Sequence, residues 1–158
     1  MEIIENNLVY NIDKSDRTIS VYCRNGYEKQ LKEAKIKTDF EIDGEQYRVT
    51  YIPIQGFRGC ITLKRIEIPA GIDRLLRSTF RDCTRLEYAY IPTTVKILLP
   101  CIFDGCCNLK KISFENLEGV KIGRDVFSGM KSERVIIEDK ASGEEYPLKE
   151  FIERFCEV

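Results

Sequence analysis

Residues 49–69 of the chain read VTYIPIQGFRGCITLKRIEIP, and the same pattern returns twice further along the sequence. The central Phe57 is followed at intervals of 23 residues by Phe80 and Phe103. A Cys stands three positions after each Phe and a Leu three positions after each Cys, giving Cys60 and Leu63, Cys83 and Leu86, and Cys106 and Leu109. A fixed period of about 20 to 50 residues is typical of stacked, solenoid-like arrays. The pattern therefore predicts a solenoid whose buried core contains the repeated Phe, Cys and Leu.

Each repeat also predicts a short strand just after its Leu. In the first copy, Ile66 and Ile68 take inward positions, and the residues between them point outward, as the period of two in a strand requires. Pro69 then ends the strand, because proline cannot donate to a continuing ladder. The outward positions form two expected rows across the stacked coils: Arg65, Tyr88 and Lys111 in one, and Glu67, Tyr90 and Ser113 in the other.

Residues 1–48 do not follow the repeat and predict a β-rich cap. Alternating apolar residues on both sides of a polar turn indicate a hairpin over 8–21. A second hairpin is indicated over 40–49, because its Asp43-Gly44 pair suits a tight turn with positive φ. Good helix formers over 28–35 predict a helix between the two hairpins, although this stretch has little apolar face.

The repeats occupy 49–139, and the fourth copy is irregular. Its Phe127 is followed by Met130 and Glu133, where Cys and Leu are expected, and the loop at 115–121 has gained one residue. Terminal repeats usually depart from the consensus because their outer face meets water. The fourth copy is therefore expected to be the last coil.

Residues 140–158 predict a helical cap. An amphipathic helix is expected over 147–156, with Pro147 in its first turn. Its apolar face consists of Leu148, Phe151, Ile152 and Phe155. Such a helix covers the exposed core of the last coil, and the alternative is a helix that binds a partner.

The run V-x-x-I-x-x-x-x-F-x-x-C-x-x-L-x-x-I-x-I-P, seen over 49–69, closely resembles the BspA-like class of bacterial leucine-rich repeats. The resemblance implies a curved, right-handed leucine-rich-repeat solenoid with a parallel β-sheet on one face and short helical or irregular segments on the other. It also implies recognition of a protein or ligand rather than catalysis. Proteins of this class are often secreted or exposed at the cell surface.

Composition excludes several classes of function. With 25 basic and 26 acidic residues the net charge is −1, so we expect neither nucleic acid nor a membrane as partner. The first residues are acidic and polar, unlike a signal peptide. We therefore expect a cytoplasmic protein if residue 1 is the native start, and an extracellular or cell-surface protein if a leader was removed.

The sequence contains seven Cys and no His, and these Cys do not form a recognised catalytic or metal-binding pattern. An odd number of Cys cannot form a complete set of internal disulfides, and we expect reduced thiols. Cys101, Cys106 and Cys107 lack the C-x-x-C spacing of a structural zinc site. A nucleophilic Cys needs an adjacent base, commonly His, and the sequence contains no His. It also contains no phosphate-binding loop. We expect no catalytic residue, no metal and no cofactor.

The two outward rows are the candidate binding site. Tyr88 and Tyr90 are adjacent on the expected sheet face with charges on both sides, which is the composition of a protein-binding hot spot. The alternative is a solvated sheet, where Tyr is present for its β-propensity. The sequence thus predicts a non-catalytic protein-binding module, with an intracellular inhibitor or immunity-type protein and a structural scaffold as alternatives. Neither the partner nor the oligomeric state follows from the sequence.

Overall fold

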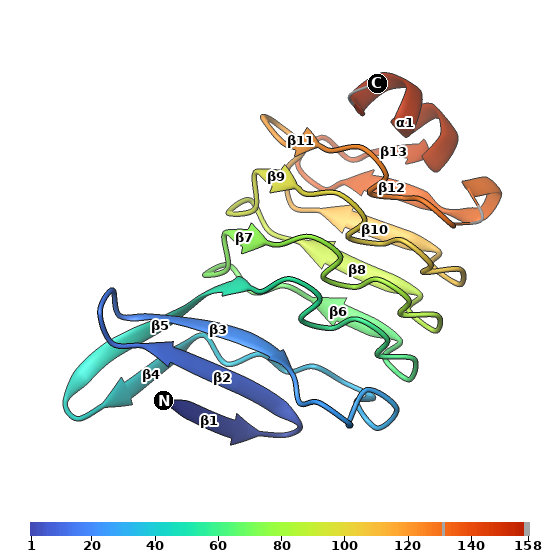
Figure 1. The fold of residues 1–158 in the computed structure, drawn as a ribbon. Helices are drawn as coiled ribbons and strands as arrows, with labels where there is room; N and C mark the ends of the chain where they lie inside the picture. The colour runs from blue at the N-terminus through green and yellow to red at the C-terminus, as the bar shows by residue number, and fades with distance from the viewer. Residues whose placement is uncertain (131, 157–158) are drawn as a thin grey trace.

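The computed structural model describes residues 1–130 and 132–156, which wind into about four turns of a β-solenoid (Figure 1). Two sheets run along the stack, one on each side. Within the described residues, sheet A holds eight strands: β1 (Glu2–Glu5), β2 (Leu8–Asp13), β3 (Thr18–Cys23), β4 (Asp39–Ile42), β5 (Glu45–Ile52), β7 (Arg74–Leu75), β9 (Ile97–Leu98) and β11 (Lys121–Ile122). Sheet B holds five: β6 (Arg65–Glu67), β8 (Tyr88–Ile91), β10 (Lys111–Phe114), β12 (Ile136–Asp139) and β13 (Glu144–Pro147).

Sheet B contains the strands that the alternating pattern predicts, and its coil strands pair in parallel, in register. The parallel part of sheet A was not predicted. Strands β7, β9 and β11 are only two residues long, so an alternation of period two has no room to show in the sequence. They continue the parallel pairing that begins at β5. The side opposite sheet B is therefore a hydrogen-bonded sheet, where short helical or irregular segments were expected.

The repeated aromatic residues form a column through the core. Phe57, Phe80 and Phe103 are fully buried, and consecutive ring centroids lie 5.6 and 5.7 Å apart. Phe127 extends the column at 6.4 Å from Phe103. The repeated Leu63, Leu86 and Leu109 are buried beside it. One side chain per coil thus packs on its equivalent in the next coil, so the aromatic core is continuous along the stack.

The repeated Cys has a polar role besides its packing. Cys83 Sγ donates to the backbone carbonyl of Phe57 at 3.0 Å, and Cys106 Sγ donates to that of Phe80 at 3.1 Å. Cys60, Cys83 and Cys106 are all buried. Each of these carbonyls also accepts a backbone N–H of its own coil, from Cys60 N and Cys83 N respectively, so the thiol adds a second, weak hydrogen bond between neighbouring coils.

Two left-handed residues bracket each Phe of the column. Two positions before the Phe, φ is 60° at Gln55, 59° at Ser78, 62° at Cys101 and 56° at Asp125; two positions after it, φ is 71° at Gly59, 61° at Asp82, 75° at Gly105 and 69° at Gly129. Between these bends, backbone N–H groups of one coil donate hydrogen bonds to backbone carbonyls of the next coil, as Phe80 N does to Ile102 O at 2.9 Å. The bends turn the chain around each ring, and they explain the partly exposed Cys101 as a bend residue rather than a core one.

The N-terminal cap is built from hairpins. Strands β2 and β3 pair antiparallel, and β4 and β5 meet at Asp43-Gly44, where φ is 55° and 79°. A further hairpin was missed: β1 pairs with β2 across Asn6-Asn7, and both residues have positive φ, as a tight hairpin turn requires. The helix predicted over 28–35 is wrong. The chain makes one turn, with Leu31 N donating to Tyr27 O, and then continues without regular secondary structure; Leu31 is the one fully buried residue of this stretch, so a helix would have too narrow an apolar face.

The C-terminal cap begins with a strand that the helical prediction over 140–158 omitted. After the short 3₁₀ helix η1 (Ser132–Arg134), β12 and β13 form an antiparallel hairpin, and α1 (Leu148–Phe155) follows it. Pro147 is the N-cap residue, immediately before the helix, and does not belong to its first turn as predicted. No helix in residues 1–130 or 132–156 has the length and apolar character needed to cross a membrane.

Candidate functional site

The outward face of sheet B carries the two predicted rows. Cα pairing places Arg65, Tyr88 and Lys111 side by side and adds Ile136 to their row. The second row consists of Glu67, Tyr90 and Ser113, with Glu138 added. The register of the last strand could not be predicted, because the last coil contains an extra residue between Phe127 and Ile137 compared with the coil before it.

The first half of this face is organised around Tyr88. The guanidinium of Arg65 lies 3.9 Å from the Tyr88 ring centroid, in a cation–π contact. Its Nε also donates to Glu67 Oε1 at 2.9 Å, so Arg65 links the two rows. Tyr88 is half-buried rather than fully exposed. The ring is therefore held in one orientation while part of its surface stays open to a ligand.

The second half is an ion-pair network around Lys111. Its Nζ lies 2.9 Å from Glu138 Oε1 and 2.7 Å from Glu145 Oε1. These bonds raise the pKa of Lys111, that to Glu145 foremost, and the Ser113 hydroxyl followed by Lys111 lowers the pKa of Glu138. Lys111 and Glu138 are therefore both charged near neutral pH.

Ser113 is the one outward residue whose predicted exposure is wrong. It is fully buried, and its Oγ donates to Glu138 Oε2 at 2.5 Å. The parity of the strand is as predicted, but a short side chain between Tyr90 and Glu138 is covered by its taller neighbours. Ser113 thus positions Glu138 and offers no surface of its own.

Tyr90, in the second row of the face between Glu67 and Ser113, is half-buried. Lys140 Nζ stands 6.0 Å from its ring centroid. Burial, and then the nearby Glu115 carboxylate, raise the pKa of the Tyr90 phenol. The hydroxyl is therefore neutral at physiological pH and available as a hydrogen-bond donor.

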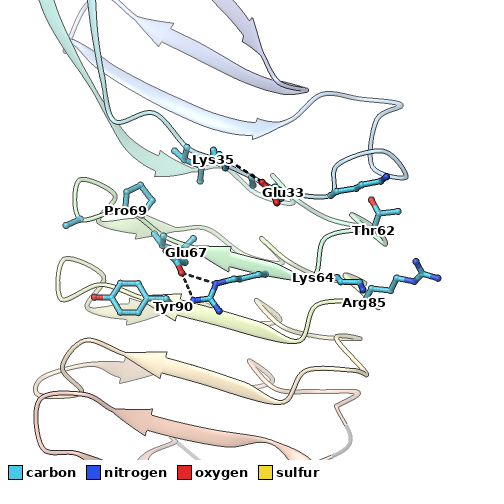
Figure 2. A pocket seen from close by; sticks show the side chains of 14 residues that line it. Glu33, Lys35, Thr62, Lys64, Glu67, Pro69, Arg85 and Tyr90 are labelled. Carbon is cyan, nitrogen blue, oxygen red and sulfur yellow. Dashed lines mark hydrogen bonds and ion pairs between the residues drawn. The ribbon is translucent and has the colours of Figure 1, made fainter.

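A groove of about 910 Å³ opens beside this face, between the connector at 32–36 and strand β6. Figure 2 shows Glu33 and Lys35 on one side of it and Glu67 and Tyr90 on the other. Lys64 and Arg85 lie at one end of the labelled set. Sequence reasoning missed this groove because it placed a helix over the residues that form its wall, and the basic composition of 29–37 was the signal that remained.

The cysteines show no sign of a reactive or ligating centre. All seven are unpaired thiols, and four of them are buried. Burial raises the pKa of Cys106 to about 12, so the thiol is protonated near neutral pH. Within residues 1–130 and 132–156, no group of three or more Cys, Asp or Glu is arranged to hold a metal ion.

Stacked coils of 23 residues, a Phe column and the parallel coil strands of sheet B define a leucine-rich-repeat solenoid. The model of the BspA type leucine rich repeat region matches residues 37–143 in six copies. The chain therefore belongs to the BspA-type leucine-rich-repeat family. None of the curated proteins is significantly similar to it.

Solved structures of bacterial proteins share the fold. A leucine-rich repeat protein from Bacteroides ovatus ATCC 8483 is 26% identical, with a TM-score of 0.67 over 85% of this chain and 36% of its own. A leucine rich cell surface protein from Faecalibacterium prausnitzii A2-165 is 16% identical, with a TM-score of 0.60 over 88% of this chain and 51% of its own. A leucine-rich repeat protein from Bacteroides capillosus ATCC 29799 is 18% identical, with a TM-score of 0.59 over 87% of this chain and 98% of its own. The chain thus spans about a third of the length of the Bacteroides ovatus protein.

The family and these neighbours are generally non-catalytic, and the fold is consistent with a protein-binding module.

Proposed function

We propose that the chain is a non-catalytic protein-binding module that contacts its partner through the outward face of sheet B. The observation that supports this most directly is the row in which Arg65, Tyr88 and Lys111 stand at successive coils. Large amphipathic rings on a rigid sheet supply contact area at little cost in conformational entropy. The surrounding ion pairs fix the charged side chains before a partner arrives, which lowers the entropy lost on binding.

The test compares two sheet faces of the same molecule. Tyr88→Ala combined with Tyr90→Ala removes the aromatic surface of sheet B, and neither side chain belongs to the core. Tyr51→Ala is the matched control, because Tyr51 also lies half-buried on a strand beneath an arginine, with Arg74 at 4.9 Å, but on sheet A.

Proteins captured from the source cell by the immobilised wild-type chain are identified by mass spectrometry and their affinities measured. We expect the double variant to weaken binding of a captured partner by about 2 kcal/mol or more. The Tyr51→Ala chain should bind as the wild type does. Equal binding by the folded double variant would contradict the assignment to sheet B.

A further inference from the structure

Strand β6 ends sheet B, and its outer edge is open. The order of the sheet is β13-β12-β10-β8-β6, so β6 has a partner on one side only. Lys64 O accepts from Tyr88 N, and Ile68 N donates to Tyr90 O, so these residues direct their backbone groups toward β8. Successive residues of a strand direct theirs to opposite sides. The N–H and C=O of Arg65 and Glu67 therefore point into the groove, where the described part of the chain provides no backbone partner.

The facing wall of the groove is also unpaired. Within residues 1–130 and 132–156, no backbone hydrogen bond is made by the connector at 32–36. Its two ends are nevertheless fixed: Thr62 Oγ1 donates to Leu31 O at 2.9 Å, and Lys37 N donates to the Tyr10 hydroxyl at 3.0 Å. The connector is thus held beside β6 without adding to the sheet, and it leaves the space of about 910 Å³ between them.

The charges around this space are unequal. Five basic residues line the groove: Lys32, Lys35, Lys64, Arg65 and Arg85. Only two acidic residues line it, and each is already paired: Glu33 with Lys35 at 3.4 Å, and Glu67 with Arg65. Among the described residues, Lys32, Lys64 and Arg85 form no ion pair and all are exposed. The groove therefore favours a negatively charged occupant, although the whole chain has a net charge of only −1.

We propose that this groove binds an acidic segment of a partner protein in an extended conformation, which pairs with β6 as an added strand. Backbone bonds to Arg65 and Glu67 would supply the pairing, and carboxylates on alternate positions would meet the unpaired cations. The buried Ile68 and half-buried Pro69 give the intervening side chains an apolar floor. This proposal rests on the proposed protein-binding function and names the chemical class of partner.

The probe is a displayed library of random linear peptides selected on the immobilised full chain. We expect enrichment of peptides in which Asp or Glu alternates with β-branched or aromatic residues, with affinity that falls as salt rises. Resynthesis with N-methyl groups on alternate amides should abolish binding in one of the two possible patterns, since only one edge of the peptide faces β6. Failure to enrich any acidic peptide, or equal binding with both N-methyl patterns, would overturn the proposal.

A backbone variant tests the pairing directly. Glu67→Pro removes an N–H that β8 does not use, and proline is tolerated on edge strands. Glu67→Ala is the matched control, because it loses the same carboxylate and keeps the N–H. We expect the selected peptide to bind the proline variant about fivefold to tenfold more weakly than the alanine variant. Equal affinities in two folded variants, checked by circular dichroism, would exclude strand addition.

Charge variants keep the proposal testable if the proline variant does not fold. Lys64→Glu with Arg85→Glu should weaken peptide binding by about tenfold or more. The control pair, Lys96→Glu with Lys121→Glu, makes the same change in net charge at exposed positions outside the groove and should have little effect. Equal losses of peptide affinity in both pairs would mean that overall charge determines binding, and would refute the groove as the binding site.

The sheet-face function and the groove can fail separately. Tyr88 does not line the groove. If Tyr88→Ala weakens binding of a natural partner while Glu67→Pro does not, the groove proposal is overturned and the sheet-face function stands. If Tyr88→Ala has no effect and Glu67→Pro weakens binding relative to Glu67→Ala, the partner binds at the edge and the sheet-face assignment is wrong.

Discussion

Single residues with unusual backbone angles set the course of each coil. Gln55, Ser78 and Cys101 occupy the left-handed region two positions before their Phe, although a side chain with Cβ is disfavoured there. The sequence did not reveal these positions, because Gln, Ser, Cys and Asp share no pattern that marks positive φ. The equivalent position after the Phe was easier to recognise, since Gly fills it in three of four coils.

Gln55→Gly is therefore expected to stabilise the protein. Glycine removes the steric penalty of the left-handed conformation, and this gain exceeds the added entropy of the unfolded chain by about 0.5–1 kcal/mol. Gln55→Ala keeps the Cβ and should not stabilise. Chemical denaturation of both variants measures the difference. Destabilisation by the glycine, relative to the alanine, would show that the side chain rather than the backbone matters at this position.

The elements divide into those with long, regular patterns and those without. The strands of sheet B and the amphipathic helix were predicted because their apolar residues recur over several positions. Strand β1 was missed because its four residues, Glu-Ile-Ile-Glu, do not alternate between apolar and polar, and only Asn6-Asn7 marks its turn. The connector was assigned to a helix on propensity alone, and tertiary anchoring of Leu31 prevailed.

Helix α1 closes the stack through Phe151, one of its two aromatic residues. Phe151 is fully buried and its ring meets Phe127 edge-on, with centroids 6.0 Å apart, so it ends the aromatic column. Phe155, one turn further along the helix, remains 37% exposed. The helix is therefore a cap over its first half, and its remaining apolar residues, Ile152 and Phe155, lie at the surface.

Replacing Phe151 or Phe155 with alanine tests whether the first half of α1 is the part that caps the stack. Phe151→Ala should lower the free energy of unfolding by about 3–5 kcal/mol, as large-to-small changes in a core do. Phe155→Ala should cost less, about 1–2 kcal/mol, since this side chain lies outside the column and is 37% exposed. Thermal or denaturant unfolding gives both values. Similar costs for the two would mean that α1 does not act as a cap in solution.

At the scale of the whole molecule, the caps and coils share continuous sheets. Sheet A runs from β1 through the hairpins to β11, and sheet B from β6 to the final hairpin. The repeat predicted this array and the two sheet-face rows, because stacking in register converts sequence spacing directly into spatial neighbours. The burial of Ser113 was not predictable because it depends on Glu138 of the irregular last coil, and the groove beside β6 was not predictable because its wall comes from the N-terminal cap.

This continuity predicts that the described array unfolds as one unit. Each coil buries its Phe mainly against neighbouring coils, so interface terms dominate the stability of the array. Calorimetry should give a single transition whose calorimetric and van't Hoff enthalpies agree. Two resolved transitions would show instead that the N-terminal hairpins fold independently of the coils.

The corner at 115–121 contains one residue more than the equivalent corner before it, yet the pairing on both sides is preserved. Ile91 and Leu98 pair with Phe114 and Ile122, so seven steps along one coil match eight along the next. Glu118 and Gly119 are exposed at the tip of this corner. Length is thus free to vary here without disturbing the stack, which makes the corner a suitable port for grafting an epitope or a reporter tag into the folded protein.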